Sequence, residues 1–531
     1  MLVATAGIDF RLAGVSVRSH SWVRVAILAA ALFLVRQRFG VDSYGPWFTR
    51  LASLTAICGS VATWFRFLLT TIGGADSYGY VSASKLIAGG QLIDRAPIAD
   101  WLSAANRLAI ASPLGWAPAA DGSGIVPTYP IGVPSVMAVF SVIGGSSAVF
   151  FVSPMMALLT LFLVYRLARE WFDPETALFA AAVVAWNPVF IAYAKQPMSD
   201  MTATMWIMLA LLLSVRTGRA SALCAGLAAG AAVLTRPALL IAAAIIPFAA
   251  HKGVRPVRRL LICGIGLSIG VVIQMAIQRH LFGSPFSTGY GSTEVLFSAS
   301  HIPANLKIFF VRYGWQVVGP LWIPGLIVGF FAAKPEPRSR PALIFCGVVI
   351  PYLFFLSFDH WETLRYLLPG IVPLTIVAAD GLIHIARMAR KPAVTAVLVA
   401  AMLIIFAGRS ESLLRHSSVW DISSLEARYP LAGDWVNVNT PPNSVVLANQ
   451  HSGSLRWYGN RQTLRWDFID PQQLETTVNE VQSHGATVYV ALEGDEVKMF
   501  DDRFAGVIDQ FQVDHVGRVR NVSFRRLLAA K

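Results

Sequence analysis

Two aspartates in this chain stand where a carboxylate could take up a proton. Asp76 lies in residues 73–80 (GGADSYGY), directly after an apolar segment, and Asp200 ends residues 195–200 (KQPMSD), directly before another. A carboxylate within hydrogen-bond reach of an acceptor hydroxyl can act as a general base. An aspartate that precedes a helix often serves only as its N-cap, and local spacing favours that simpler interpretation for Asp76.

Two further loops carry groups that can do chemistry. Residues 127–134 (PTYPIGVP) place Tyr129 between prolines that impose an extended entry into an apolar stretch. Asp359, His360 and Glu362 lie close enough in sequence to bind a metal or relay protons. Such a group more often belongs to a solvated loop anchored by interfacial aromatic residues. A divalent metal is therefore possible but is not predicted, and no cofactor is assigned.

The composition is that of a membrane protein. Of 531 residues, 55% are hydrophobic and 14% charged, whereas soluble chains carry about 25% charged residues. The net charge of +13 comes from short basic clusters between apolar runs, as in cytoplasmic loops, and does not indicate nucleic-acid binding. The four cysteines lie inside apolar runs and form neither a disulfide framework nor a metal-ligand pattern.

A membrane-spanning helix needs about 20 mainly apolar residues, and many such segments recur up to residue 408. Two other segments, 23–36 and 129–144, are ambiguous, and the second is interrupted by prolines. The predicted spans are 51–70, 147–167, 176–194, 201–215, 220–235, 237–250, 260–278, 315–333, 341–358, 364–386 and 392–408.

The basic clusters select one orientation. If residues preceding 51–70 are cytoplasmic and 129–144 is a juxtamembrane or re-entrant piece, every basic cluster falls on the cytoplasmic side. Loop 71–128, the 195–200 junction, loops 279–313 and 358–365, and the C-terminal domain then face outward. The predicted domains are 1–50 with a possible extra helix, 51–410 as the membrane domain including 71–128, and 411–531 as a soluble domain.

The C-terminal domain has the pattern of a small α/β module. Residues 444–449 and 487–492 read as short strands, and residues 472–483 as the helix between them.

Four cations lie near the outer helix ends in this orientation. A cation at that depth costs a few kcal/mol unless it reaches the headgroups or finds an anion. A lipid phosphate is such an anion, and arginine can bind it through two hydrogen bonds. Reaching the headgroups explains any one of them, but four on the face of the acids favour a phosphate site. They are Arg66, Lys195, Arg236 and Arg365.

These motifs together resemble those of the GT-C superfamily of polytopic glycosyltransferases. The resemblance is to bacterial family 39-like members related to protein O-mannosyltransferases and aminoarabinose transferases. It is carried by the stretch from Asp76 to Tyr80, the Tyr129-Pro130 loop, the junction 196–200, and the Arg365-Tyr366-Leu-Leu-Pro369 run. Residues 451–461 and 465–467 also resemble the extra-cytoplasmic tail of such proteins.

The resemblance implies a polytopic α-helical protein of about 11–13 transmembrane helices in the bacterial cytoplasmic membrane, with an extra-cytoplasmic C-terminal α/β domain. It implies an inverting transfer from a polyprenyl-phosphate sugar to an acceptor hydroxyl of a lipid, glycan or protein. Asp76 corresponds to the general base, and Asp200 to an acid that orients the acceptor or a cation. The implied binding residues are Arg66, Lys195, Arg236, Arg365, Tyr366, Tyr80 and Tyr129.

The chain departs from both relatives, which leaves the acceptor class open. Ser77 follows Asp76, where protein O-mannosyltransferases carry an Asp-Glu pair. Residues 127–130 stand where aminoarabinose transferases have a Lys-Pro-Pro element. Two alternatives remain beside the enzyme: a transporter or flippase of lipid-linked sugars, and a non-catalytic relative. The acids at the membrane edge and the lack of two similar halves weigh against a transporter.

Overall fold

The computed structural model describes residues 8–12, 15–19, 45–249, 256–291, 296–332 and 335–529, so the ambiguous segment 23–36 lies outside the described residues. Strands β1 (Ile8–Leu12) and β2 (Val15–Ser19) form an antiparallel pair. The chain divides into two compact units, each built from separate stretches of sequence. Unit 1 comprises residues 1–68, 151–274 and 294–420, and unit 2 comprises residues 69–150, 275–293 and 421–531.

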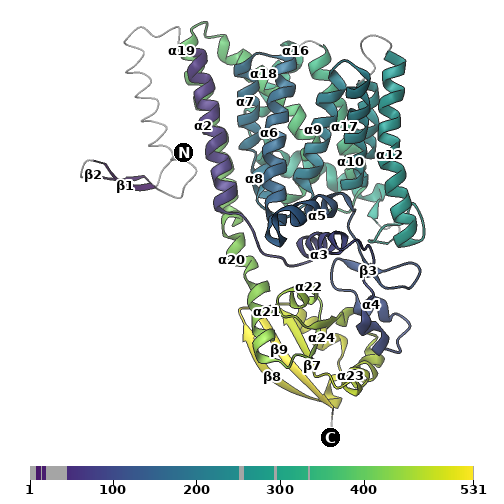
Figure 1. Cartoon of the computed structure of the whole chain (residues 1–531). Helices are drawn as coiled ribbons and strands as arrows, with labels where there is room; N and C mark the ends of the chain where they lie inside the picture. The colour runs from purple at the N-terminus through teal and green to yellow at the C-terminus, as the bar shows by residue number, and fades with distance from the viewer. Residues whose placement is uncertain are drawn as a thin grey trace. The chain divides into compact units, whose positions relative to one another are not determined.

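Unit 1 is helical, and its helices coincide with the predicted spans (Figure 1). The predicted span 176–194 is interrupted, because Asn187 caps a new helix and Pro188 occupies its first turn. The predicted span 315–333 is interrupted as well, between a helix that ends at Val318 and one that begins at Trp322. The helices are α2 (Gly45–Arg66), α6 (Val152–Trp171), α7 (Pro174–Ala185), α8 (Pro188–Ala194), α9 (Asp200–Val215), α10 (Arg219–Thr235), α11 (Leu240–Ala249), α12 (Pro256–Phe282), α14 (Ile302–Leu306), α15 (Gly314–Val318), α16 (Trp322–Ala332), α17 (Pro335–Phe354), α18 (Leu368–Arg387) and α19 (Pro392–His416).

Four helical stretches of the described residues are long and apolar enough to cross a membrane. They are Ser146–Trp171, Pro256–Phe282, Trp361–Arg387 and Pro392–His416. Two helix pairs bent by 68° and 94°, Pro174–Ala185 with Pro188–Ala194 and Ala299–Val318 with Trp322–Ala332, raise the number to six if each is one span. The protein is therefore a multi-pass α-helical membrane protein, as predicted.

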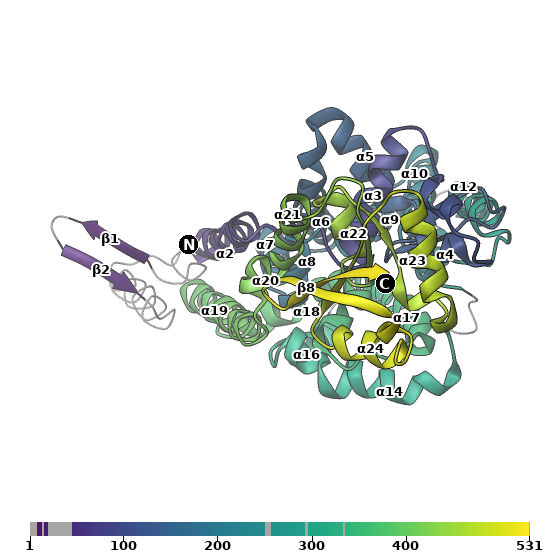
Figure 2. The same ribbon diagram turned by 90° about the horizontal axis from the view of Figure 1, so that it is seen from below.

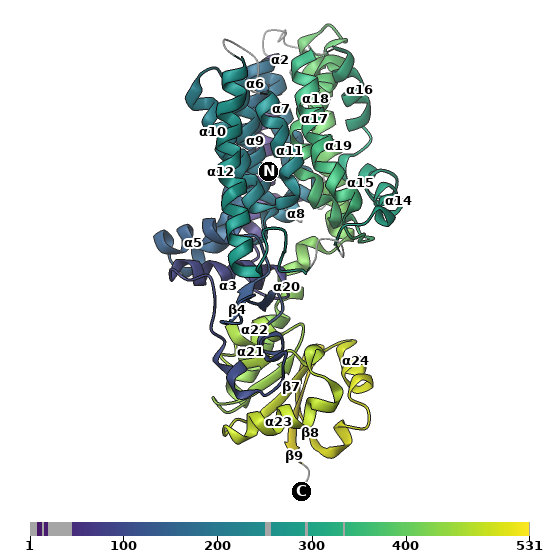
Figure 3. The same cartoon turned by 90° about the vertical axis from the view of Figure 1, so that its right-hand side faces the viewer.

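Small residues let the helices of unit 1 approach closely. Helices α10 and α12 lie side by side (Figure 3), with Gly226 and Gly230 of one facing Gly266 and Gly270 of the other. A Cβ at Gly226 would lie 2.0 Å from the backbone oxygen of Cys263, so no larger residue fits there. Glycines four residues apart on facing helices are the common device for close packing in membranes.

Unit 2 begins with helix α3 (Asp76–Ala88), which packs beside α5 (Gly132–Gly144) in Figures 1 and 3. Helix α5 has 13 residues and is therefore about 20 Å long, less than the roughly 30 Å of a hydrocarbon core. That length suits the juxtamembrane prediction for residues 129–144. Along the chain, α3 and α5 are separated by α4 (Arg107–Ala111) and by the antiparallel strands β3 (Trp116–Pro118) and β4 (Ile125–Pro127).

The C-terminal part of unit 2 is a five-stranded sheet in the order β6-β5-β7-β9-β8. The predicted strands and helix are confirmed as β5 (Val445–Ala448), β7 (Val488–Glu493) and α23 (Leu474–Ser483). Strands β6 (Gln462–Leu464), β5 and β7 are parallel, whereas β9 (Val522–Ala529) and β8 (Phe511–Val519) are antiparallel additions.

Helices cover both faces of this sheet. In Figure 2, α21 (Arg428–Asn439) and α22 (Ser452–Trp457) lie on one side of the strands, and α24 (Glu496–Arg503) lies on the other. Alternate strand residues such as Val446 and Ala491 form a core with Val436 and Leu455 of α21 and α22.

Candidate functional site

Asp76 begins helix α3, and its carboxylate is held by a tyrosine from a distant loop. The hydroxyl of Tyr129 donates a hydrogen bond of 2.7 Å to Asp76 Oδ1. Asp76 is the first residue of the helix, and Ala75 stands at the capping position without a side-chain cap. The N-cap alternative is therefore wrong for this geometry. The carboxylate is half-buried and gains from the positive end of the helix dipole.

Two more tyrosines complete this cluster. The ring of Tyr80 lies 4.6 Å from that of Tyr129, and the ring of Tyr290 meets Tyr129 edge-on at 5.8 Å. Gly79 makes this packing possible, because a Cβ there would lie 2.2 Å from the Tyr129 ring. We call Asp76, Tyr80, Tyr129 and Tyr290 the tyrosine–carboxylate cluster.

The chemistry of this cluster follows from burial. Burial, and then the nearby Asp76 charge, raise the pKa of Tyr129 well above its ordinary value. Tyr129 therefore stays protonated at neutral pH and remains a hydrogen-bond donor to Asp76. Tyr129 thereby fixes one oxygen of a carboxylate, a group that can act as a general base toward a hydroxyl.

The C-terminal part of unit 2 anchors the residues that lead into Asp76. The hydroxyl of Tyr458 accepts a hydrogen bond from the Ile72 amide at 2.8 Å. The ring of Tyr429 packs so tightly on Gly73 that a Cβ there would lie 1.9 Å from it. Ser77 Oγ closes the turn by bonding both the amide and the carbonyl of Gly73. The turn before Asp76 is thus fixed from two sides.

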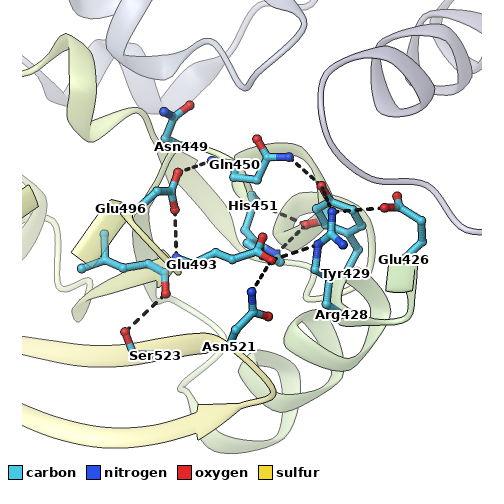
Figure 4. A network of polar contacts seen from close by, with 12 residues as sticks. Glu426, Arg428, Tyr429, Asn449, Gln450, His451, Glu493, Glu496, Asn521 and Ser523 are labelled. Carbon is cyan, nitrogen blue, oxygen red and sulfur yellow. Dashed lines mark hydrogen bonds and ion pairs between the residues drawn. The ribbon is translucent and has the colours of Figure 1, made fainter. Parts of the chain in front are cut away.

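Tyr429 is itself part of a polar network at the carboxyl ends of β5 and β7 (Figure 4). Glu493 lies at its centre, with its Oε2 2.9 Å from His451 Nε2 and its Oε1 accepting from the Asn521 amide at 2.8 Å. Arg428 pairs with Glu493 at 3.0 Å. Burial raises the pKa of Glu493, but the His451 hydrogen bond and the neighbouring positive charges outweigh it and bring that pKa below its ordinary value.

This network reaches Tyr429 through Gln450, whose side-chain amide donates to the Tyr429 hydroxyl at 2.6 Å. We call Glu426, Arg428, Tyr429, Gln450, His451, Glu493, Glu496 and Asn521 the sheet-edge network. Arg428 pairs with Glu426 and Glu493, and Glu496 accepts hydrogen bonds from two backbone amides, so we assign the network the role of holding Tyr429 in place.

Unit 1 contains a second cluster, built on the start of α9. Asp200 is fully buried and begins that helix; Arg236 Nη2 lies 2.7 Å from Asp200 Oδ1, and Arg236 Nε donates to Ser199 Oγ at 2.9 Å. Asp200 Oδ2 has no hydrogen-bond partner among the described residues. The Asp200 carboxylate is thus ion-paired with Arg236.

Two guanidinium groups flank one aromatic ring in the same unit. The Arg236 and Arg365 guanidinium carbons lie 5.3 and 5.1 Å from the ring centroid of Tyr366. Arg365 also lies 5.3 Å from the ring centroid of Tyr193, and Tyr352 stacks on Tyr366 at 4.9 Å. We call Asp200, Arg236, Arg365, Tyr366, Tyr193 and Tyr352 the arginine–tyrosine cluster. It places two arginines beside one buried carboxylate, and arginine is a common ligand of phosphate groups.

The other two predicted cations lie elsewhere in unit 1. Lys195 is fully buried, donates to the Val419 carbonyl and lies 5.5 Å from the Trp420 ring centroid. Arg66 ends α2 at the surface, with its guanidinium 5.4 Å from the Phe67 ring centroid. These contacts involve a backbone carbonyl and aromatic rings, and they give no support to the predicted phosphate-binding role of either cation.

The weak metal candidates do not converge. His360 Nδ1 lies 2.9 Å from Glu362 Oε2, whereas Asp359 pairs with Arg312. Across the described ranges, no group of three or more His, Cys, Asp or Glu side chains could hold a metal ion.

Sequence reasoning missed Tyr290, Tyr193 and Tyr352. Tyr290 and Tyr352 stand in loop and apolar contexts that give no chemical signal, and only their packing identifies them. Tyr193 was detectable in principle, because it lies two residues before Lys195 at the junction already singled out.

Comparisons with known proteins agree with this architecture. The family described as dolichyl-phosphate-mannose-protein mannosyltransferase matches residues 128–277. The crystal structure of apo ArnT from Cupriavidus metallidurans superposes with a TM-score of 0.53 at 13% identity, covering 89% of this chain and 97% of that one. The same protein bound to undecaprenyl phosphate gives a TM-score of 0.52 at 13% identity and the same coverage. No curated protein sequence matches the chain.

The archaeal oligosaccharyltransferase AglB from Archaeoglobus fulgidus, in complex with an inhibitory peptide and a dolichol-phosphate, is more distant. It gives a TM-score of 0.49 at 12% identity, covering 84% of this chain and 70% of that one. The superposition on ArnT thus covers nearly the whole of both chains. The chain therefore shares the fold of ArnT, and its residues 128–277 match the mannosyltransferase family model.

Proposed function

We propose that this protein transfers a sugar from a polyprenyl-phosphate donor to an acceptor hydroxyl on the outer face of the membrane, with inversion. The observation that carries the proposal is the half-buried Asp76 carboxylate, held by Tyr129 at 2.7 Å at the start of a helix. Supporting it is the fold shared with ArnT, which has been crystallised with undecaprenyl phosphate.

In this reaction the acceptor hydroxyl attacks the anomeric carbon and transfers its proton to Asp76. The bond between that carbon and the phosphate oxygen breaks, and the polyprenyl phosphate leaves with the bonding electrons. Negative charge grows on the phosphate as the bond breaks, and fixed cations stabilise it. Arg236 and Arg365 are the cations that we assign to this role, with Tyr366 holding both guanidinium groups.

The test is sugar transfer by purified protein supplied with candidate polyprenyl-phosphate sugars and membrane extract as the source of acceptor. Asp76→Asn should lower transfer by about 10²- to 10⁴-fold, the usual effect of losing a general base. Asp100→Asn is the matched control, because Asp100 lies in the same unit, is exposed, and pairs only loosely with Arg107 at 3.6 Å. Full activity of Asp76→Asn would remove Asp76 from the role of base.

The outer-face assignment has a separate test. In a variant without the four native cysteines, Asp100→Cys should react in intact cells with a maleimide that does not cross membranes. Reaction only after the cells are broken would place loop 71–128 in the cytoplasm and overturn the orientation.

A further inference from the structure

Unit 2 contains a pocket that the proposed chemistry leaves unused. It has a volume of about 680 Å³ and lies between the later part of α3 and the residues around the start of β5 and the end of α22. Pockets that hold drug-sized ligands have volumes of about 300–1,000 Å³. The lining that carries the argument is Tyr78, Lys85, Trp101, Trp116, Ser444 and Trp457.

The pocket and the tyrosine–carboxylate cluster occupy opposite faces of α3. Tyr78, Ser82 and Lys85 follow the spacing of one helical stripe and line the pocket. Asp76 and Tyr80 form another stripe, rotated by about 200° from the first, and both contact Tyr129. A ligand in the pocket would therefore lie behind the helix that presents Asp76.

The walls combine flat aromatic rings with uncharged polar groups. Trp101, Trp116 and Trp457 supply the rings, and Asn460 and Gln462 supply amides. A sugar ring presents C–H groups on its faces and hydroxyls around its edge. Aromatic rings bury the apolar faces, while amide groups bond the hydroxyls. The lining thus fits a carbohydrate and offers no continuous apolar wall for a lipid chain.

Two lining groups have hydrogen-bonding capacity left over. Ser444 is 2% exposed, and its hydroxyl has no hydrogen-bond partner among the described residues. Buried hydroxyls are nearly always satisfied, and leaving one unsatisfied costs about 1–3 kcal/mol. The Lys85 ammonium lies 5.3 Å from the Trp457 ring centroid, and no hydrogen bond or ion pair to another described side chain is recorded for it. Ligand hydroxyls would satisfy both groups.

The two arginines that line the pocket use most of their donors on the protein itself. Arg456 and Arg461 line the pocket, but the Nη2 donors of both bond backbone carbonyls at 2.6–3.1 Å. They hold the wall together and are not arranged as an anion site. The remaining charges are Lys85 and Asp94, one of each sign.

We propose that this pocket binds a neutral oligosaccharide, apart from the site of sugar transfer. Its recognition elements are the Trp101 and Trp457 rings, the Ser444 hydroxyl and the Lys85 ammonium. The proposal goes beyond the transferase function and does not require turnover, because binding can be measured on protein that carries Asp76→Asn.

The experiment is isothermal titration of full-length protein in detergent with tetrasaccharides of glucose, mannose, galactose and N-acetylglucosamine. We expect at least one to bind, and Trp457→Ala and Trp101→Ala each to weaken that binding by about tenfold or more. Trp315→Ala is the matched control, since Trp315 is 46% exposed and lies in unit 1. Lys85→Gln should weaken binding, whereas Lys498→Gln, which changes an exposed lysine of unit 2, should not.

Thermal unfolding of each variant keeps the test interpretable. If a tryptophan variant is misfolded, Lys85→Gln and Ser444→Ala carry the test, because both retain the backbone and most of the packing. The proposal is overturned if no neutral tetrasaccharide binds, if folded pocket variants bind as the parent does, or if only acidic sugars bind. Unaltered binding in Asp76→Asn separates this site from the transferase site, and its loss would show that the two are one.

Discussion

The ion pair between Asp200 and Arg236 gives the most quantitative prediction. Asp200 is fully buried, Arg236 is 9% exposed, and the charged atoms are 2.7 Å apart. Asp200→Asn preserves the shape of the side chain but leaves the guanidinium buried without its counter-charge. Removing one partner of a buried pair costs about 3–5 kcal/mol. Arg236→Gln should cost a similar amount, because it leaves the Asp200 carboxylate buried without its ion-pair partner.

The double variant separates pairing from other losses. With both charges gone, its cost should fall below the sum of the two single costs by about 1–3 kcal/mol. The free energy of unfolding would be measured by titration with dodecyl sulfate in mixed micelles. The control is the exposed pair Glu170 and Arg216, 3.5 Å apart in the same unit, where coupling should be below about 1 kcal/mol.

Additive costs for Asp200→Asn and Arg236→Gln, within about 0.5 kcal/mol, would show that the two side chains are not energetically coupled. In that case each side chain stabilises the protein independently of the other, and the ion pair contributes no stability. An Asp200→Asn variant with the parent's free energy of unfolding would also contradict the prediction, because removing one partner of a buried ion pair should be costly.

Three other predictions concern single contacts. Tyr129→Phe removes the hydrogen bond to Asp76 and should lower the rate of sugar transfer about tenfold, measured as kcat; an unchanged kcat would show that the bond does not orient the base. Gly73→Ala forces a methyl group into the Tyr429 ring and should cost about 1–3 kcal/mol, measured as a lower unfolding temperature; an unchanged temperature contradicts the packing. Burial raises the pKa of Asp173, but the Arg387 hydrogen bond holds it well below its ordinary value of about 3.9. The parent should therefore lose stability as pH falls below that value, and Asp173→Asn should lose less over the same range in thermal unfolding.

Local patterns were enough to locate most elements of this fold. Apolar runs of membrane-spanning length marked the helices of unit 1, and short β-branched runs marked β5 and β7. These signals are reliable because the polarity of each side chain depends on whether it faces lipid, the protein core or water. The break between α7 and α8 also has a local signal, Asn187 followed by Pro188, although the apolar run 176–194 predicts one continuous span.

The contacts that make a site could not be read in the same way. Tyr129 stands 53 residues from Asp76, and Tyr429 stands more than 350 residues from the Gly73 that it packs against. Nothing in the periodicity around either residue names its partner, because such pairs are created by the folded chain. The motif at 73–80 indicates Asp76 as a candidate. The need for Gly73 and Gly79 follows only from the structure, in which Tyr429 packs on the first and Tyr129 on the second.

The two aspartates that looked equivalent in sequence are placed in opposite situations, and this difference assigns their roles. A general base must meet its substrate and take a proton without losing a partner it depends on. Asp76 is half-buried and accepts a hydrogen bond from the neutral hydroxyl of Tyr129, which can persist when the other carboxylate oxygen takes a proton. Asp200 is fully buried and ion-paired with Arg236, and a proton on it would remove that ion pair. We therefore assign proton transfer to Asp76 and the positioning of Arg236 to Asp200.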